Sequence, residues 1–220
     1  MVEIGGNKRA EKVDLALGSE STQRELFEEV RPLVEKTMEG FNVSLLTYGQ
    51  TGSGKTHTMF GSDWSNIIRR GGGERQEQAT FLRSIEQDEN YAGIIPRTIH
   101  LLFGELITRR RKFIKVYCSF LQIYNEQMAD LLHDEPRQPQ KLLIHENKQD
   151  GIYVEGLNEV AVEDPDQCLE LMRRGERNRV VRQTHMNVKS SRSHTIFTLL
   201  VEEVFPSKKS YRVAGLLGSE

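Results

Sequence analysis

The segment from Gly49 to Thr56 reads GQTGSGKT and places three glycines just before a lysine and a threonine. Glycine gives up more backbone freedom on folding than any other residue, so such a run indicates a specialised turn rather than packed core. The preceding stretch NVSLLTY predicts a short buried strand, and the following KTHTMF predicts a helix. A chain with this order of strand, turn and helix is expected to form an α/β domain.

This glycine-rich segment satisfies the pattern G-x-x-x-x-G-K-[ST], which is typical of loops that bind phosphate groups. Its glycines allow backbone N–H groups to point at phosphate oxygens, and the positive end of the following helix adds to the attraction. In such a loop the Lys55 ammonium reaches the β- and γ-phosphates and the Thr56 hydroxyl ligates Mg²⁺. We therefore expect a nucleotide site here; the alternative is a glycine-rich turn that binds nothing.

The rest of the chain alternates between helical and strand patterns without an internal repeat, which predicts one domain over residues 1–220. Helices are expected at 21–40, where Thr22 and Glu25 can form a capping box, at 95–106, and after Asp164. Strands are expected at 112–124, around 142–163, at 194–204 and at 210–217. The polar stretch from 61 to about 90 is expected to be a surface loop, or alternatively a lid beside the site.

Composition narrows the possible partners. A formal net charge of −2 provides no overall basic field for binding nucleic acid or an anionic membrane. No secretory signal and no apolar stretch long enough to span a bilayer are present, so membrane insertion is not expected. The two cysteines, Cys118 and Cys168, lack metal-ligand spacing and are expected to be reduced thiols in a soluble intracellular protein.

A second polar motif, NVKSSRSHTIFTL, runs from Asn187 to Leu199 and directly precedes an expected strand. Serine hydroxyls suit a Mg²⁺ ligand or a contact that positions water, and an arginine suits a charge clamp. The chemistry alone leaves two interpretations open, a switch loop beside the nucleotide or a plain polar turn.

Together these motifs resemble the kinesin motor family. The similar segments, in kinesin order, are FNVSLLTYGQTGSGKTHTM, GIIPRTIHLLF, FLQIYNEQMADLL, GIYVEGLNEV, NRVVRQTHMNVKSSRSHTIFT and the terminal GSE. The resemblance extends from about residue 15 to residue 220 and is interrupted mainly by the loop at 61–90. It implies an α/β P-loop fold with a mixed, largely parallel sheet and helices on both faces. It also implies an ATPase that uses ATP and Mg²⁺ to move on microtubules in the cytoplasm.

The resemblance also implies roles for particular residues in the first half of the site. Those expected to hold the ATP phosphates are Gly49, Gln50, Thr51, Gly52, Ser53, Gly54, Lys55 and Thr56. His57 matches a position that packs against the adenine, although it could equally be an exposed helix residue.

For the two switches, the resemblance implies that Asn187 and Ser190 line the γ-phosphate and the attacking water, and that Ser191 approaches Mg²⁺. Gly218 would offer its backbone N–H to the γ-phosphate. Arg192 and Glu220 would close the pocket as an ion pair, with Glu220 relaying a proton. The alternative for this pair is a solvated surface ion pair worth less than about 1 kcal/mol.

Two departures from the family pattern affect the expected activity. The second switch of kinesins reads Asp-Leu-Ala-Gly-Ser-Glu, whereas this chain reads GLLGSE and has Gly215 at the aspartate position. The missing carboxylate should weaken metal binding. The chain also lacks the family's Arg-x-Arg-Pro strand, most microtubule-binding elements, and the neck that sets the oligomeric state. We therefore expect part of a motor domain, truncated or a relic; the alternatives are a non-hydrolysing pseudo-motor and a non-motor interaction module.

Overall fold

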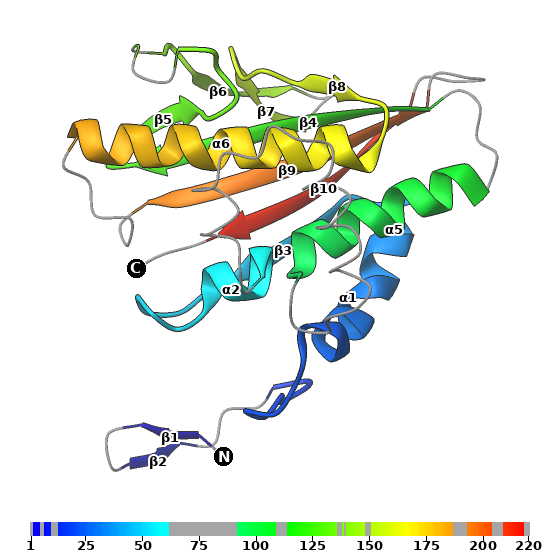
Figure 1. The fold of residues 1–220 in the computed structure, drawn as a ribbon, viewed down its shortest axis with the longest axis vertical. Coiled ribbons are helices and arrows are strands. Elements are labelled where there is room, and N and C mark those ends of the chain that lie inside the picture. Colours follow the sequence, from blue (N-terminus) through cyan, green and yellow to red (C-terminus); the bar gives the residue numbers. More distant parts are fainter. Residues whose placement is uncertain are drawn as a thin grey trace.

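The computed structural model describes residues 2–4, 7–9, 13–61, 92–108, 114–135, 138, 140–147, 151–186, 193–203 and 209–217. A six-stranded sheet has the order β3-β10-β9-β4-β5, with β8 also paired to β4 (Figure 1). Its strands are β3 (Val43–Thr47), β4 (Ile114–Tyr124), β5 (Gln127–Asp130), β8 (Val160–Val162), β9 (His194–Glu203) and β10 (Lys209–Leu217). Two separate hairpins pair β1 (Val2–Ile4) with β2 (Asn7–Arg9), and β6 (Leu143–Asn147) with β7 (Gly151–Glu155). The helices are α1 (Gln23–Thr37), α2 (Lys55–Phe60), α5 (Ile94–Thr108) and α6 (Pro165–Met186).

The helix ends follow the local signals in the sequence. At the start of α1, the backbone N–H of Glu25 donates to Thr22 Oγ1 at 3.1 Å and that of Thr22 donates to Glu25 Oε2 at 2.9 Å. These two bonds confirm the predicted capping box. The chain leaves the helix at Gly40, whose φ of +101° favours glycine. At the start of α6, Asp164 Oδ1 accepts a hydrogen bond from the Gln167 backbone N–H at 2.8 Å, as expected for a cap.

The α/β class is confirmed, but the expectation of a largely parallel sheet is wrong for the described strands. Only β3 and β10 pair in parallel; β10 with β9, β9 with β4, and β4 with both β5 and β8 are antiparallel. Short connections explain the antiparallel pairing of β4 with β5 and of β9 with β10, because parallel neighbours need a long crossover. Asn125 and Glu126, at φ of +47° and +62°, form the two-residue turn of the β4–β5 hairpin.

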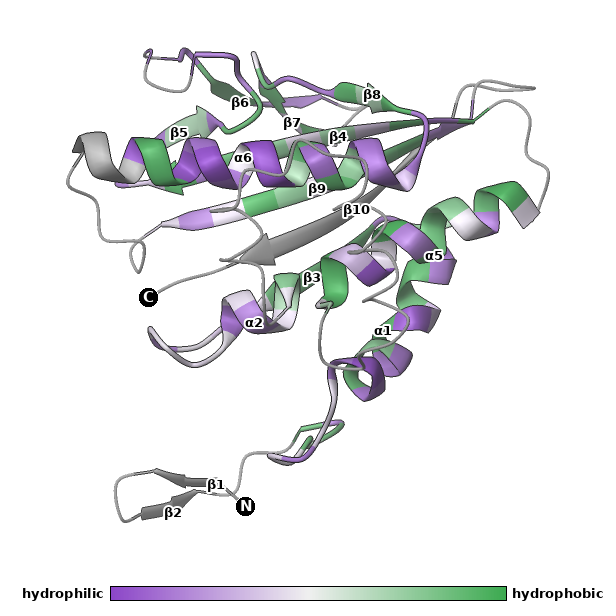
Figure 2. Ribbon diagram, viewed as in Figure 1, coloured by the Kyte–Doolittle hydropathy of each residue, from purple (hydrophilic) through white to green (hydrophobic). Residues whose placement is uncertain are grey.

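The expectation of helices on both faces is also wrong for the described part of the chain. The hydrophobic core is shared by α1, α2, α5 and α6 and by alternate residues of β4 and β9, which point to one face of the sheet. Those strand residues are Val116, Cys118, Phe120, Phe197, Leu199 and Val201. Figure 2 shows that β4 and β9 are hydrophobic over most of their length. No described helix contributes to a core on the opposite face.

The predicted burial of β3 is only partly correct. Alternate residues of this strand are half-buried, while Ser44 and Leu46 are exposed, Leu46 by 61%. Within the described residues β3 pairs only with β10 and contacts α1 and α2. It is therefore an edge strand of the described sheet, with one face covered.

The two cysteines meet within the core although they are 50 residues apart in the sequence. Both are free and fully buried, and their Sγ atoms lie 3.1 Å apart between β4 and α6. Burial raises the pKa of the Cys168 thiol well above its usual value, with the hydrogen bond to Cys118 adding to the shift. A thiol held in its protonated form is a poor nucleophile, so Cys168 serves packing.

Gly175 sets how closely α6 approaches the sheet. A Cβ atom added at this position would overlap the ring of Phe120, which itself packs edge-on against Phe197 with ring centroids 5.4 Å apart. We expect Gly175→Ala to lower the free energy of unfolding by about 1–3 kcal/mol, because the helix must shift away from the core. Thermal or denaturant unfolding measures the change.

Gly104 of α5 provides the matched control, because an added Cβ there meets no atom within 4 Å. Gly104→Ala should leave stability unchanged or raise it by up to about 1 kcal/mol, since alanine is the better helix former. Equal effects of the two substitutions would contradict the proposed close approach of α6.

Candidate nucleotide-binding site

The P-loop, Gly49 to Thr56, connects the end of β3 to the start of α2. Its three glycines have positive φ angles, +154° at Gly49, +82° at Gly52 and +94° at Gly54. A Cβ atom at Gly49 would also lie 2.6 Å from Ser53 Oγ. The backbone conformation therefore favours glycine at all three positions, and at Gly49 the space does so as well, as expected for a loop whose backbone N–H groups face a ligand.

Lys55 is the buried cation of this loop. The residue is 9% exposed, whereas its neighbours in the loop are half-buried or exposed. Its ammonium donates to the carbonyl oxygen of Gln50 at 2.8 Å and to that of Gly49. These contacts hold a positive charge against the backbone of the loop. An ammonium has three N–H donors, so two carbonyl contacts leave capacity for an anion.

The ends of three strands lie close to this loop. The last residue of β10, Leu217, pairs in parallel with Thr47 at the end of β3 and also faces Thr195 at the start of β9. The end of β3, the end of β10 and the start of β9 therefore share one edge of the sheet. The predicted switch residues lie outside the described residues, as does the loop predicted at about 61–90 except for residue 61. These switch residues are Asn187, Ser190, Ser191, Arg192, Gly218 and Glu220.

The described residues fit a phosphate group well and a metal ion only in part. The positive-φ glycines and the buried Lys55 suit an anion. For Mg²⁺, Thr56 is the second residue of α2 and offers an exposed hydroxyl. Gly215 lies in β10 between Leu45 of β3 and Phe197 of β9 and supplies no carboxylate. Among the described residues, no group of three or more acidic, histidine or cysteine side chains could hold a metal.

His57 follows the P-loop on the first turn of α2. Its side chain contacts Gln23, which the sequence patterns did not predict. Gln23 Nε2 lies 2.6 Å from the His57 carbonyl oxygen and 2.9 Å from the ring Nδ1. A signal for this contact exists, because Gln23 starts the buried stripe of α1 that continues with Phe27 and Val34. A polar residue on an apolar stripe indicates a buried hydrogen-bond partner.

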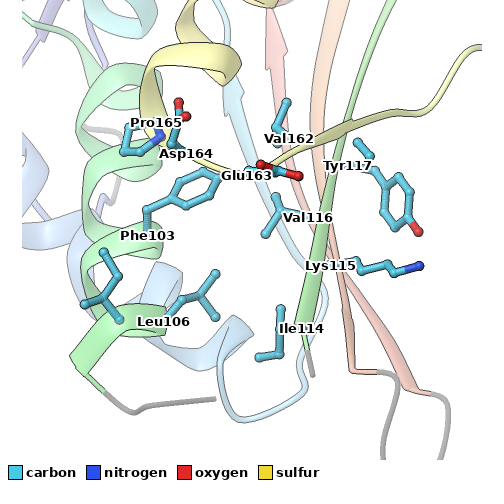
Figure 3. A pocket seen from close by; sticks show the side chains of 12 residues that line it. Phe103, Leu106, Ile114, Lys115, Val116, Tyr117, Val162, Glu163, Asp164 and Pro165 are labelled. Atoms are coloured by element: carbon cyan, nitrogen blue, oxygen red, sulfur yellow. The ribbon is translucent and has the colours of Figure 1, made fainter. Parts of the chain in front are cut away.

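A cavity of about 690 Å³ lies between α5 and β4, away from the P-loop. Figure 3 shows Phe103 and Leu106 of α5 facing Ile114 and Val116 of β4, while the Lys115 side chain points to the other side of the strand. β4 runs in the same direction as β3, and the cavity surrounds its first residues. It therefore lies at the opposite edge of the sheet from the P-loop, and its mostly apolar walls do not suit a triphosphate.

A glycine-rich loop with a buried lysine, between a strand and a helix of an α/β sheet, defines a P-loop nucleotide-binding domain. Comparison with known proteins then identifies the family. The family model for the kinesin motor domain matches residues 4–217. This chain therefore belongs to the kinesin motor domain family, whose members bind nucleotide and interact with microtubules.

Individual relatives agree with this assignment. "Kinesin-related protein 5" of Dictyostelium discoideum is 39% identical over 192 residues, covering 86% of this chain and 17% of the relative. "Kinesin heavy chain" of Syncephalastrum racemosum is 37% identical over 226 residues, covering 99% of this chain and 21% of the relative. A solved structure described as that of a fast kinesin superposes with a TM-score of 0.71 at 32% identity, covering 89% of this chain and 50% of that one.

The chain thus spans about a fifth of the length of these relatives. In the described part of the chain, none of the helices combines the length and apolar character required to cross a membrane.

Proposed function

We propose that this chain is the nucleotide-binding and ATP-hydrolysing part of a microtubule motor. The observation that carries the proposal is the P-loop with its buried Lys55, in a chain that the kinesin motor family matches over residues 4–217. The ligand is Mg-ATP, and the place of action is the microtubule cytoskeleton of the cytoplasm. The domain comprises residues 1–220, with the stretch at about 61–90 as an insertion loop.

In this proposal the chain acts by positioning and by neutralising charge rather than by covalent chemistry. The backbone N–H groups of the P-loop and the Lys55 ammonium bind the phosphates. The hydroxyls of Thr56 and Ser191 would hold Mg²⁺, which when bound would supply further positive charge at the phosphates. His57 packs against the base.

The switch segments complete the site. Asn187 and Ser190 orient the water that attacks the γ-phosphate in line, and the Gly218 N–H stabilises the charge on its oxygens. Arg192 and Glu220 pair to close the pocket, and Glu220 helps to take the proton from the water. These roles are consistent with the shared edge formed by the ends of β3, β10 and β9.

One observation favours a second candidate, a domain that binds nucleotide without hydrolysing it. Gly215, at the position of the family's aspartate, lies in β10 near the P-loop edge and offers no metal-directed carboxylate. A third class, an interaction module that has lost nucleotide binding, has no support from the geometry of the loop.

Two measurements separate these functions. Titration of the 220-residue protein with Mg-ATP by calorimetry should show saturable binding, and an absence of binding would leave only the interaction module. Release of inorganic phosphate, measured with and without microtubules, then distinguishes the motor ATPase from the non-hydrolysing domain. Phosphate release that microtubules accelerate is the result expected for the proposed function.

Microtubule binding by this chain alone is expected to be weak. The chain covers half of the solved fast kinesin. The helices that the structure describes all pack on one face of the sheet. In a co-sedimentation assay with a non-hydrolysable ATP analogue, most of the protein should remain in the supernatant at micromolar tubulin. Tight, nucleotide-dependent co-sedimentation would show that the microtubule interface lies within these 220 residues.

A further inference from the structure

We propose that Gln23 is a positioning residue for the nucleotide site, which fixes the His57 ring for contact with the base. The inference rests on the proposed function, because it assigns a role within the same site. Gln23 is the first residue of α1 and is only 5% exposed. Its side chain crosses to α2, 34 residues further along the chain.

The two contacts of Gln23 determine which way its amide is turned. The His57 carbonyl oxygen can only accept a hydrogen bond, so the side-chain atom 2.6 Å from it must be the NH₂ group. The same carbonyl also accepts from the Gly61 backbone N–H at 2.9 Å, at the point where α2 ends. Gln23 therefore shares the His57 carbonyl oxygen with the backbone N–H that ends this short helix.

The orientation of the amide in turn determines the tautomer of His57. The NH₂ group that donates to the carbonyl has a second hydrogen, and the ring Nδ1 lies 2.9 Å away. A nitrogen that accepts this hydrogen bond carries no proton, so the neutral ring has its proton on Nε2. The hydrogen bond from Gln23 thus restrains the orientation of the His57 ring and favours the tautomer with its proton on Nε2.

His57 lies where a ring held in a fixed orientation could contact a nucleotide base. The residue is exposed, two positions after Lys55, whereas Met59 and Phe60 on the same helix are buried. An exposed planar ring beside a phosphate site can stack on a nucleotide base, and such a contact is favourable only if the ring is held in place. Gln23 provides that restraint from a buried position at the start of α1.

The test compares two ligands that share the phosphate site and differ in the base, ADP and inorganic pyrophosphate, each titrated with Mg²⁺ by calorimetry. Gln23→Met keeps the length of the side chain and removes both donors. We expect its affinity for ADP to fall about three- to tenfold, as for the loss of one or two hydrogen bonds, while its affinity for pyrophosphate changes less than about twofold. Gln127→Met, the same change at an exposed position of β5, is the control and should alter neither.

A double-mutant cycle with His57→Ala tests whether Gln23 acts through the ring. In the His57→Ala background, Gln23→Met should have little further effect on ADP affinity. Long-range ¹H–¹⁵N spectra of the imidazole provide an independent readout. The wild-type protein should show an unprotonated Nδ1 and a protonated Nε2, and Gln23→Met should show a mixture of tautomers.

Several results would overturn the inference. Equal losses for ADP and pyrophosphate would mean that Gln23 supports the loop as a whole, and unchanged ADP affinity or an unchanged tautomer would mean that it does not position His57. If Gln23→Met is unfolded by circular dichroism, Gln23→Leu, which is also uncharged and lacks both donors, replaces it with the same expected outcomes. Binding of neither ligand by the wild-type protein would refute the proposed function and this inference with it.

Discussion

Replacing Lys55 by alanine is expected to abolish Mg-ATP binding while leaving the fold intact. The ammonium is buried at the centre of the P-loop and held by the carbonyl oxygens of Gly49 and Gln50. A charge-assisted contact to phosphate is too strong for a neighbouring neutral group to replace, so affinity should fall by at least about 100-fold. Calorimetry measures the loss, and circular dichroism verifies the fold.

Lys115→Ala provides a matched control for the same loss of charge. Lys115 lies on β4 with its side chain exposed, beside the cavity at the opposite edge of the sheet. Its removal should leave ATP affinity unchanged. If Lys55→Ala bound Mg-ATP as tightly as the wild-type protein, the assignment of the loop as the phosphate site would have to be abandoned.

Restoring a carboxylate at position 215 is expected to strengthen metal binding. Gly215 pairs with Leu45 of β3 and Phe197 of β9, two positions before the end of β10 at the P-loop edge. The family resemblance implies an aspartate at this position, whose carboxylate would hold the metal through water. Gly215→Asp, placed in a complete motor domain, should lower the Mg²⁺ concentration needed for ATPase activity and raise turnover, by about 10–100-fold.

The control for this substitution is Gly215→Asn, which has nearly the same shape without the charge. If the carboxylate acts on the metal, only the aspartate variant should shift the Mg²⁺ dependence of phosphate release. A carboxylate that meets no metal would instead add negative charge near the phosphates and weaken ATP binding. No gain from aspartate would mean that another residue has taken over its role or that β10 does not lead into the second switch.

The P-loop illustrates how much of the site could be predicted from the sequence. The strand before it, the glycines within it and the helix after it were all expected, and the structure has β3, three positive-φ glycines and α2 in that order. The outcome is different for Gln23. Its place on the buried stripe of α1 was visible, but nothing local indicated that its partner would be His57. The roles of the switch residues and of His57 toward ATP stay predictions.

The sequence by itself determined the features that depend on neighbours within a few positions. The capping box of Thr22 and Glu25 and the cap at Asp164 form between residues three apart. The positive φ angles of the P-loop occur at glycines, the residue type that adopts them without steric cost. Only the tertiary structure decided the antiparallel order of β10, β9, β4 and β5, and the packing of the four helices on one face. It also decided which distant side chains meet, Gln23 with His57 and Cys118 with Cys168. Periodicity shows which face of an element is buried but not which element covers it, because that depends on the packing of the whole core.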